Sequence, residues 1–85
     1  MNYQITLKHA AEKDVLNLDD ETYARVEAAL AALQANPRPR GTRKMHSKEE
    51  RWRLRVGDYR ILYEIDDRRS QITVYRVRHR REAYR

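Results

Sequence analysis

Cysteine is absent from this 85-residue chain, which excludes a disulfide scaffold, a thiolate zinc site and a cysteine nucleophile. Two glycines and two prolines are too few for a linker or a low-complexity chain. No apolar run approaches the roughly 20 residues of a membrane span, and residues 1–4 lack the charged start and apolar stretch of a signal peptide. We therefore expect one cytoplasmic domain that crosses no membrane.

The charge that is present is unevenly divided along the chain. Residues 37–85 hold sixteen of the nineteen Lys and Arg residues but seven of the thirteen Asp and Glu residues, so the net charge of +6 is concentrated there. Only Lys44 and Lys48 are lysines in that half. Because guanidinium groups bind phosphate through paired hydrogen bonds and stack on bases, this composition favours a nucleic acid as partner. A basic surface that serves only solubility is the alternative.

The first half of the chain predicts a strand and two helices. Residues 3–7 alternate apolar and polar, as in a strand with one buried face. Apolar spacings of three and four predict a short helix from His9 to Leu18. A second helix is predicted over Asp20–Ala35, capped by Asp19 and ended before Pro37. The two helices are expected to form an antiparallel hairpin, and the second to bury a stripe made of Tyr23, Val26, Leu30 and Leu33.

The second half predicts three antiparallel strands, at Arg51–Val56, Tyr59–Ile65 and Gln71–Val77. Residues 42–50 are polar and show no pattern that predicts a helix or a strand, although a short strand is expected to start at residues 43–45. The predicted fold class is α+β: an N-terminal strand, the helical hairpin and a three-stranded meander in one sheet, with a short C-terminal tail. Residues 1–85 form a single domain in this prediction, and the pattern leaves the face of Tyr75 open.

The two-residue loop at Gly57 and Asp58 determines how the first two strands of the meander pair. Arg55 then lies opposite Arg60, and this repulsion costs about a few tenths to 1 kcal/mol. We interpret the one-sign face formed by Arg51, Arg53, Arg55 and Arg60 as a phosphate-binding surface. Neutralisation by Glu49, Glu50, Glu64 or an acidic partner is the alternative. The opposite face is expected to be core, with the cross-strand pairs Val56–Tyr59, Leu54–Ile61 and Trp52–Tyr63.

Two segments carry a family likeness. With W-R-L-R-V-G-D-Y-R at residues 52–60 and H-R-R-E-A-Y at residues 79–84, the chain resembles the RelE branch of the RelE/ParE toxin superfamily over essentially its whole length. The resemblance implies a type II toxin that enters the ribosomal 30S A site and cleaves messenger RNA there. The ribose 2′-hydroxyl would attack the adjacent phosphate without a metal or other cofactor. It also implies a cognate RelB-like antitoxin as partner.

The resemblance implies roles for individual residues. Arg53 and Arg55 fall where the family has two basic residues that contact phosphate and assist removal of the 2′-proton. Arg60 falls at the arginine that stabilises the transition state. Arg80 matches the arginine that supports the leaving oxygen, and Tyr84 matches the aromatic residue that orients the nucleotide. Further contacts with RNA are expected from Lys44, Arg51, Arg78 and Arg81.

The general base is the point at which the chain departs from the family. Arginine stays protonated, so Arg55 is a poor proton acceptor where the family often has lysine. Histidine is the side chain best suited to accept a proton at neutral pH, so His79, beside Arg80, is our expected proton acceptor. The alternative is that His79 binds phosphate or ends the last strand.

Two other functions share these features. A ParE-like toxin would inhibit DNA gyrase by binding, without nuclease activity, and an RNA-binding module would act without turnover. The combination of Tyr84 with the arginines at 53, 55, 60 and 80 favours the ribonuclease.

Overall fold

A computed structural model describes residues 2–45 and 51–83. For residues 82 and 83 it describes the backbone but not the side chains. The α+β class is confirmed, and the sheet is larger than the predicted meander. None of the helices in these described ranges is long and apolar enough to cross a membrane. In chain order the elements are β1 (Gln4–Leu7), α1 (His9–Leu16), α2 (Asp20–Ala35), β2 (Thr42–Lys44), β3 (Arg51–Val56), β4 (Tyr59–Asp66), β5 (Gln71–His79) and α3 (Arg80–Ala83).

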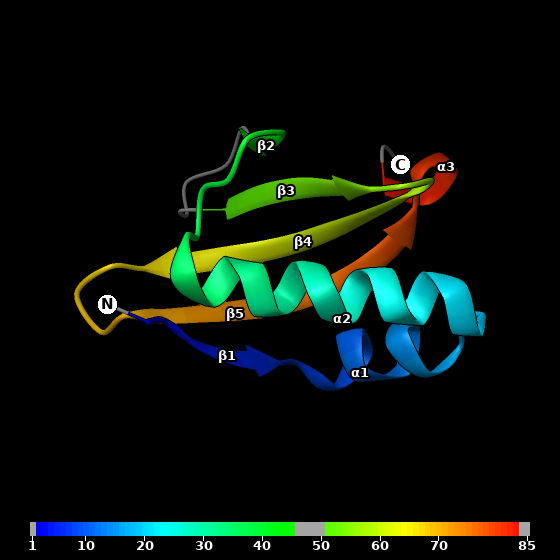
Figure 1. The fold of residues 1–85 in the computed structure, drawn as a ribbon, viewed down its shortest axis with the longest axis horizontal. Helices are drawn as coiled ribbons and strands as arrows, with labels where there is room; N and C mark the ends of the chain where they lie inside the picture. Colours follow the sequence, from blue (N-terminus) through cyan, green and yellow to red (C-terminus); the bar gives the residue numbers. More distant parts are fainter. Residues whose placement is uncertain (1, 46–50, 84–85) are drawn as a thin grey trace.

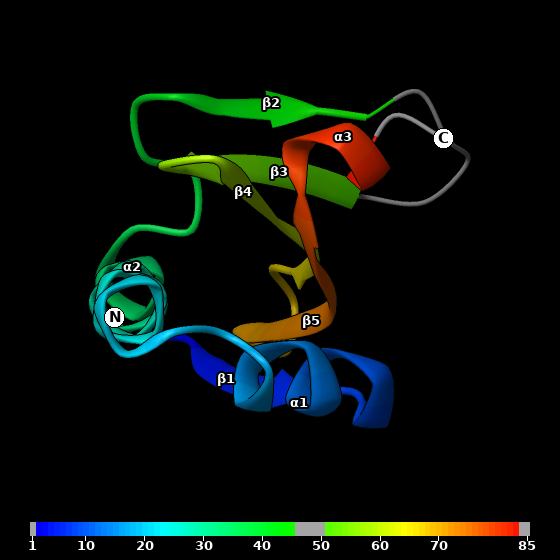
Figure 2. The ribbon, with the colours of Figure 1, turned by 90° about the vertical axis from the view of Figure 1, so that its right-hand side faces the viewer.

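The strands form one mixed sheet in the order β1-β5-β4-β3-β2. The strand β1 runs parallel to β5, and every other neighbouring pair is antiparallel. The helix α2 runs along one face of the sheet (Figure 1), whereas α3 lies on the other side (Figure 2). We call the face turned away from α2 the open face. The strand start expected at residues 43–45 is the three-residue strand β2, which pairs with β3.

The helix α2 has the predicted bounds and the predicted cap. The backbone N–H of Thr22 donates to Asp19 Oδ1 at 2.7 Å, and hydrogen bonding from Thr22 lowers the pKa of the Asp19 carboxyl. Three members of the predicted stripe are buried, but Tyr23 is 42% exposed. The prediction for Tyr23 was wrong because the first turn of α2 extends past the end of the sheet (Figure 1), where no strand lies beneath it.

The helix α1 ends at Leu16 and does not lie alongside α2 as a hairpin partner. Figure 2 looks down the axis of α2 but sees α1 from the side, so the two helices cross steeply. The reason is that α1 is bound to β5. The Asp14 carboxylate accepts hydrogen bonds from the backbone N–H of Val77 at 2.9 Å and from Arg76 Nε and Nη2 at 2.8 and 3.1 Å. Because β1 pairs with β5 only as far as Val74, Asp14 covers the edge that β1 leaves exposed.

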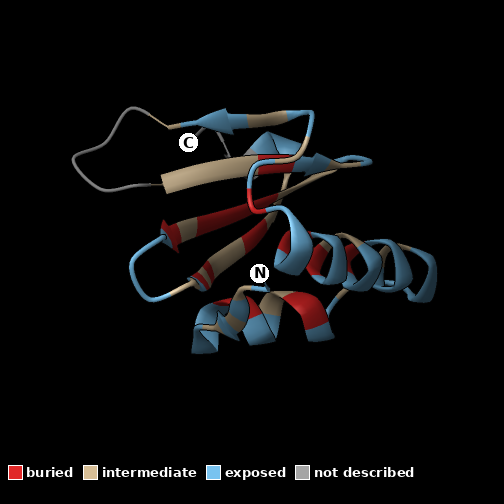
Figure 3. Ribbon diagram, turned by 60° about the vertical axis from the view of Figure 1, so that its left-hand side comes forward, coloured by how far each residue is buried: buried red, intermediate tan, exposed pale blue. Residues whose placement is uncertain are grey.

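The core lies between the sheet and the helices α1 and α2, where the buried residues gather (Figure 3). The predicted register of the β3–β4 hairpin is confirmed at each cross-strand pair. Gly57 has φ +60° at the first loop position, a left-handed conformation that suits glycine. Tyr63 is fully buried, and Trp52 is partly buried against the core, as expected.

A β-bulge changes the alternation of β5. Val74 and Val77 are both buried although they stand three residues apart. Tyr63 pairs with Val74 and Leu62 with Arg76, so Tyr75 is the extra residue of the bulge. The bulge allows both valines to face the core and leaves Tyr75 outside it.

The Tyr63 hydroxyl joins the α2–β2 connection to the sheet. It donates to the Pro37 carbonyl oxygen at 2.8 Å, and burial raises the pKa of the phenol. We expect Tyr63→Phe to lower the free energy of unfolding by about 1–2 kcal/mol, because the buried carbonyl loses its partner. Urea denaturation measures this, with Tyr23→Phe on the exposed part of α2 as the control. Equal stability of the two variants would contradict the assigned role of this hydrogen bond.

Candidate functional site

Arginine side chains from three strands line one pocket on the open face. Arg43 comes from β2, Arg53 and Arg55 from β3, and Arg60 from β4, and Gly41 completes the lining. The pocket has a volume of about 250 Å³. In the register, Arg43 lies opposite Arg53 and Arg55 opposite Arg60. We call this the arginine pocket.

The pocket follows from strand alternation. Leu54 and Ile61 are buried on the α2 side, so the residues on either side of them in β3 and β4 point to the open face. Gly41, at φ +95°, precedes β2, and a Cβ there would meet no atom within 4 Å. Glycine allows this backbone conformation and leaves space at the rim of the pocket.

Leu62 is an apolar residue of the open face that does not line the arginine pocket. Leu62 lies opposite Arg53 in the register and is 7% exposed, yet it does not belong to the core cluster. Its burial therefore comes from side chains on the open face, consistent with aliphatic arginine stems covering it. Arg55 is exposed and donates through Nε to the Gly57 carbonyl oxygen at 3.2 Å, whereas Arg60 is half-buried. Guanidinium groups so close together repel one another, and a bound phosphate would relieve that repulsion.

Two further arginines of the predicted RNA-binding set lie on the open face. Arg78 is opposite Arg60 in the register and is half-buried. Arg51 donates through Nε to Glu64 Oε1 at 3.1 Å. Glu64 therefore neutralises Arg51, which agrees with the alternative interpretation that acidic residues neutralise this surface. Glu64 does not line the arginine pocket, however. Glu49 and Glu50 lie outside the described residues.

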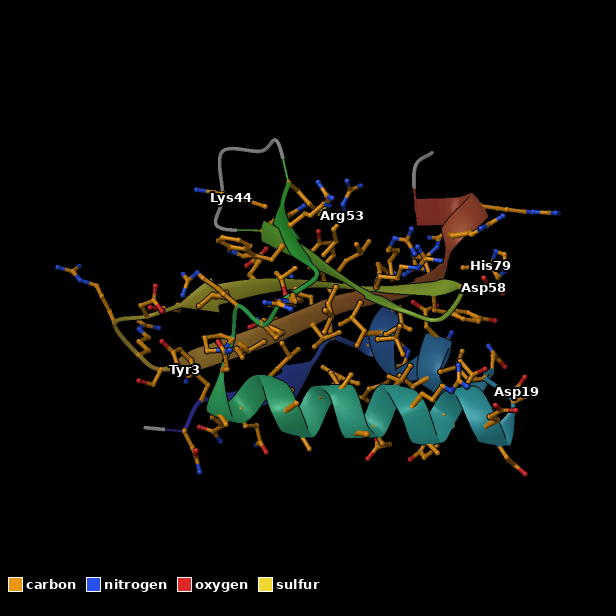
Figure 4. The ribbon with its side chains drawn as sticks, turned by 45° about the horizontal axis from the view of Figure 1, so that its top comes forward. Tyr3, Asp19, Lys44, Arg53, Asp58 and His79 are labelled. Carbon is orange, nitrogen blue, oxygen red and sulfur yellow. The ribbon has the colours of Figure 1, made fainter. Side chains whose placement is uncertain are left out.

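Lys44 is on the opposite face from the pocket, so the structure does not group it with the arginines. It pairs with Trp52 in the register, and its Nζ lies 6.0 Å from the centre of the Trp52 ring. Arg38 also lies over this ring, at 5.0 Å. Figure 4 shows Lys44 and Arg53 on either side of β2. Alternation along β2 separates Lys44 from the pocket and puts Arg43 there instead.

The predicted tail residues begin beside the β3–β4 turn. The backbone N–H of Arg80 donates to the Asp58 carbonyl oxygen at 2.7 Å, which joins the start of α3 to that turn. The side chains of Arg80 and Arg81 are exposed, and the Arg81 N–H donates to His79 Nδ1 at 3.3 Å. Tyr84 lies outside the described residues.

His79 does not line the arginine pocket. It pairs with Tyr59 in the register, on the face opposite Arg60 and Arg78, and meets the Tyr59 ring edge-on at 5.3 Å between centroids. It lies beside Asp58 at the turn (Figure 4) and lines a second pocket of about 520 Å³ next to the start of α2. Arg55 borders both pockets. His79 faces away from the arginine pocket because successive strand residues face opposite ways.

The sequence analysis missed Arg43 and Gly41 as site residues. Their position depends on the pairing of β2 with β3, which residues 46–50 separate along the chain. The polar segment from residue 42 onward has no apolar alternation from which this pairing could have been inferred. Within residues 2–45 and 51–83, no three His, Asp or Glu side chains gather as metal ligands would.

Comparison with known proteins gives the same fold and one family. The family model described as "ParE toxin of type II toxin-antitoxin system, parDE" matches residues 5–84. The toxin RelG of Mycobacterium tuberculosis is 31% identical over 86 residues, covering 100% of this chain and 99% of that protein.

Two solved complexes contain similar chains. One is the archaeal RelE–RelB complex from Pyrococcus horikoshii OT3, with a TM-score of 0.85 and 23% identity over 96% of this chain and 99% of that one. The other is the toxin–antitoxin complex RelBE2 from Mycobacterium tuberculosis, with a TM-score of 0.79 and 28% identity over 93% of this chain and 99% of that one.

Arg55 and Arg60 lie opposite each other in the pocket, so removing one charge should weaken anion binding without destabilising the fold. We expect Arg55→Gln to elute from a heparin column at lower salt than the unaltered protein, since an anion contact is lost. Its free energy of unfolding should stay the same or rise by a few tenths of a kcal/mol, because repulsion with Arg60 is removed.

Arg69→Gln is the matched control for both measurements, since Arg69 is exposed in the β4–β5 turn and lies 3.8 Å from Asp66. If Arg55→Gln and Arg69→Gln elute alike, the pocket is not the anion site.

Proposed function

This chain belongs to the ParE toxin family of type II toxin–antitoxin systems, and from its arginine pocket and its similarity to RelE-type toxins we propose that it is a ribosome-dependent endoribonuclease. In this proposal the protein enters the A site and promotes attack of a ribose 2′-hydroxyl on the adjacent phosphate of messenger RNA, without a metal ion. The P–O5′ bond breaks, the 2′-hydroxyl gives up its proton and the leaving 5′-oxygen takes one up, which leaves a 2′,3′-cyclic phosphate and a 5′-hydroxyl. The observation that carries the proposal is the convergence of four arginines from three strands in one pocket. Its similarity to the toxin RelG and to RelE-type structures supports the RelE branch of the family.

The reaction needs negative charge to be stabilised on the phosphate as it becomes five-coordinate. Guanidinium groups held on a rigid sheet before the substrate arrives do this without reorganising. We propose that Arg53 and Arg55 hold the phosphate and that Arg60, half-buried on β4, stabilises the charge of the transition state. Arg43 is the addition that the pocket geometry brings to this set.

We propose that Arg80 supports the leaving oxygen and that Tyr84 orients the nucleotide. Support for Arg80 comes from the hydrogen bond that joins its backbone to the turn between β3 and β4, next to the pocket residues of both strands. An arginine at this point can reach a phosphate ester from the side of the tail. The role of Tyr84 rests on the family resemblance alone.

His79 is left out of the proposed mechanism because it faces the second pocket. We expect His79→Ala to retain single-turnover cleavage within about threefold, a change that corresponds to less than 1 kcal/mol in the barrier. The measurement is cleavage of a defined message on stalled ribosomes with toxin in excess. A loss of a hundredfold or more at unchanged ribosome binding would make the imidazole the general base after all.

The proposed partner is a RelB-like antitoxin. The RelE and RelBE2 proteins to which this chain is similar were solved in complex with antitoxins. An acidic, flexible chain that folds on binding would match the positive charge of the open face and would cover the arginine pocket. Inhibition by such a partner requires only that messenger RNA be excluded from the pocket.

The decisive experiment maps transcript ends in growing cells that express the toxin. The unaltered protein should produce new message ends at ribosomal A sites. Arg60→Ala should lower their frequency by about 10²–10³, the usual effect of removing one preorganised group that stabilises a transition state. Arg68→Ala, an exposed arginine at the opposite end of the sheet, should leave the frequency unchanged.

Circular dichroism of the purified variants controls for folding. The matching family model carries the ParE description, so DNA breaks that depend on gyrase are measured in the same cells. Gyrase-dependent breaks without new message ends would replace the ribonuclease by a gyrase inhibitor. Stalled translation with neither product would leave a binding function without turnover.

A further inference from the structure

Tyr75 is an aromatic side chain of the sheet that takes no part in the core. Tyr3, Trp52, Tyr59 and Tyr63 belong to the core cluster or pack against it, whereas Tyr75 does neither. Tyr75 is the extra residue of the bulge in β5, and it is only half-buried, whereas Val74 and Val77 are buried. Bulges beside active sites commonly redirect a side chain in this way.

Tyr75 contacts Arg51 of the open face and Met45 just beyond β2. The guanidinium carbon of Arg51 lies over the ring, 4.6 Å from its centroid. The Tyr75 hydroxyl lies 3.3 Å from Met45 Sδ, and Glu64 holds Arg51 from β4 through the 3.1 Å contact at Nε. A ring anchored at its hydroxyl and a guanidinium anchored at Nε therefore form a stacked pair whose parts are both held in place.

This stacked pair lies next to the arginine pocket. Arg51 is two residues from Arg53 on the same strand and the same face, which corresponds to about 6.8 Å at the usual rise of a β-strand. Neighbouring phosphates of an extended single strand of RNA are separated by a similar length. A strand with one phosphate in the pocket would thus bring its next nucleotide to Arg51 and Tyr75.

We propose that Arg51 and Tyr75 together form a stacking platform for an unpaired RNA base, next to the nucleotide whose phosphate occupies the arginine pocket. The inference rests on the proposed function and adds to it a second point of contact with the substrate. Aromatic rings and guanidinium planes are the surfaces on which proteins stack single-stranded bases. Because every base has a flat face, the platform positions the message without selecting a sequence.

The test is a double-mutant cycle between the protein and a short RNA. The probe is a fluorescein-labelled 2′-O-methyl adenosine trimer, which has no free 2′-hydroxyl to react, together with the three trimers that each carry one abasic position. Fluorescence anisotropy at low salt gives the dissociation constants. For the unaltered protein, one abasic position should weaken binding about tenfold, a typical effect of losing one stacked base.

Two variants of the platform should lose this discrimination. Tyr75→Leu removes the ring, and Arg51→Lys keeps the charge but removes the planar group, so each should bind the abasic and complete trimers about equally. Tyr75→Phe loses the hydroxyl contact with Met45 but keeps the ring under the Arg51 guanidinium, so it should still discriminate against the abasic trimer. Tyr23→Leu makes the same change on α2 and should have no effect. If Tyr75→Leu does not fold by circular dichroism, Arg51→Lys decides.

The outcomes separate this inference from the proposed function. Equal abasic penalties in the unaltered protein and the platform variants would overturn the platform, as would equal binding of all four trimers by the unaltered protein. Arg53→Ala is measured with the complete trimer. If Arg53→Ala lowers the affinity but the abasic penalty is the same with and without the Tyr75 ring, the platform alone is rejected. No loss in Arg53→Ala, or no binding of any trimer, rejects the RNA site and the platform with it.

Discussion

The register of the β3–β4 hairpin is the constraint on which the rest of the structure depends. A two-residue loop beginning at Gly57 pairs Leu54 with Ile61 under α2, and the same register must then pair Arg55 with Arg60 on the other face. A slip by one residue would exchange the faces and bury the arginines. The hydrophobic core and the cationic site are therefore two consequences of one pairing, and the burial energy of the core holds like charges together.

Two features of β5 extend this arrangement beyond the hairpin: the hydrogen bonds of its edge to α1 and the bulge at Tyr75. Asp14 of α1 binds the backbone of β5 where β1 ends, which protects the strand edge and draws Arg76 toward the helix. The bulge at Tyr75 then lets β5 keep both Val74 and Val77 in the core. As a result, side chains from β2, β3, β4 and β5 lie on the open face. The helix α3 follows β5 directly and lies beside the β3–β4 turn, to which the Arg80 N–H is hydrogen-bonded.

A toxin of this kind needs a surface that is strongly cationic when free and can be covered by a partner. In the proposed function, like charges on a rigid sheet would meet both needs, because messenger RNA and an acidic antitoxin would each relieve the same repulsion. Catalysis by stabilising charge in a preorganised site is also open to a small domain without a cofactor. In the proposed mechanism, orientation of the message comes partly from the ribosome and partly from contacts along the open face.

The local pattern of the sequence determined the helix α2 with its Asp19 cap, the hairpin turn at Gly57 and the face to which each arginine of β3 and β4 points. Each of these depends on residues close together in the chain, and alternation or spacing reveals them. Tertiary structure alone decided that Arg43 joins the pocket, that Lys44 and His79 do not, and that Tyr75 leaves the core. Those outcomes depend on the pairing of β2 with β3, the bulge between β4 and β5 and the binding of α1 to a strand edge, and contacts between distant segments leave no periodic trace in a sequence.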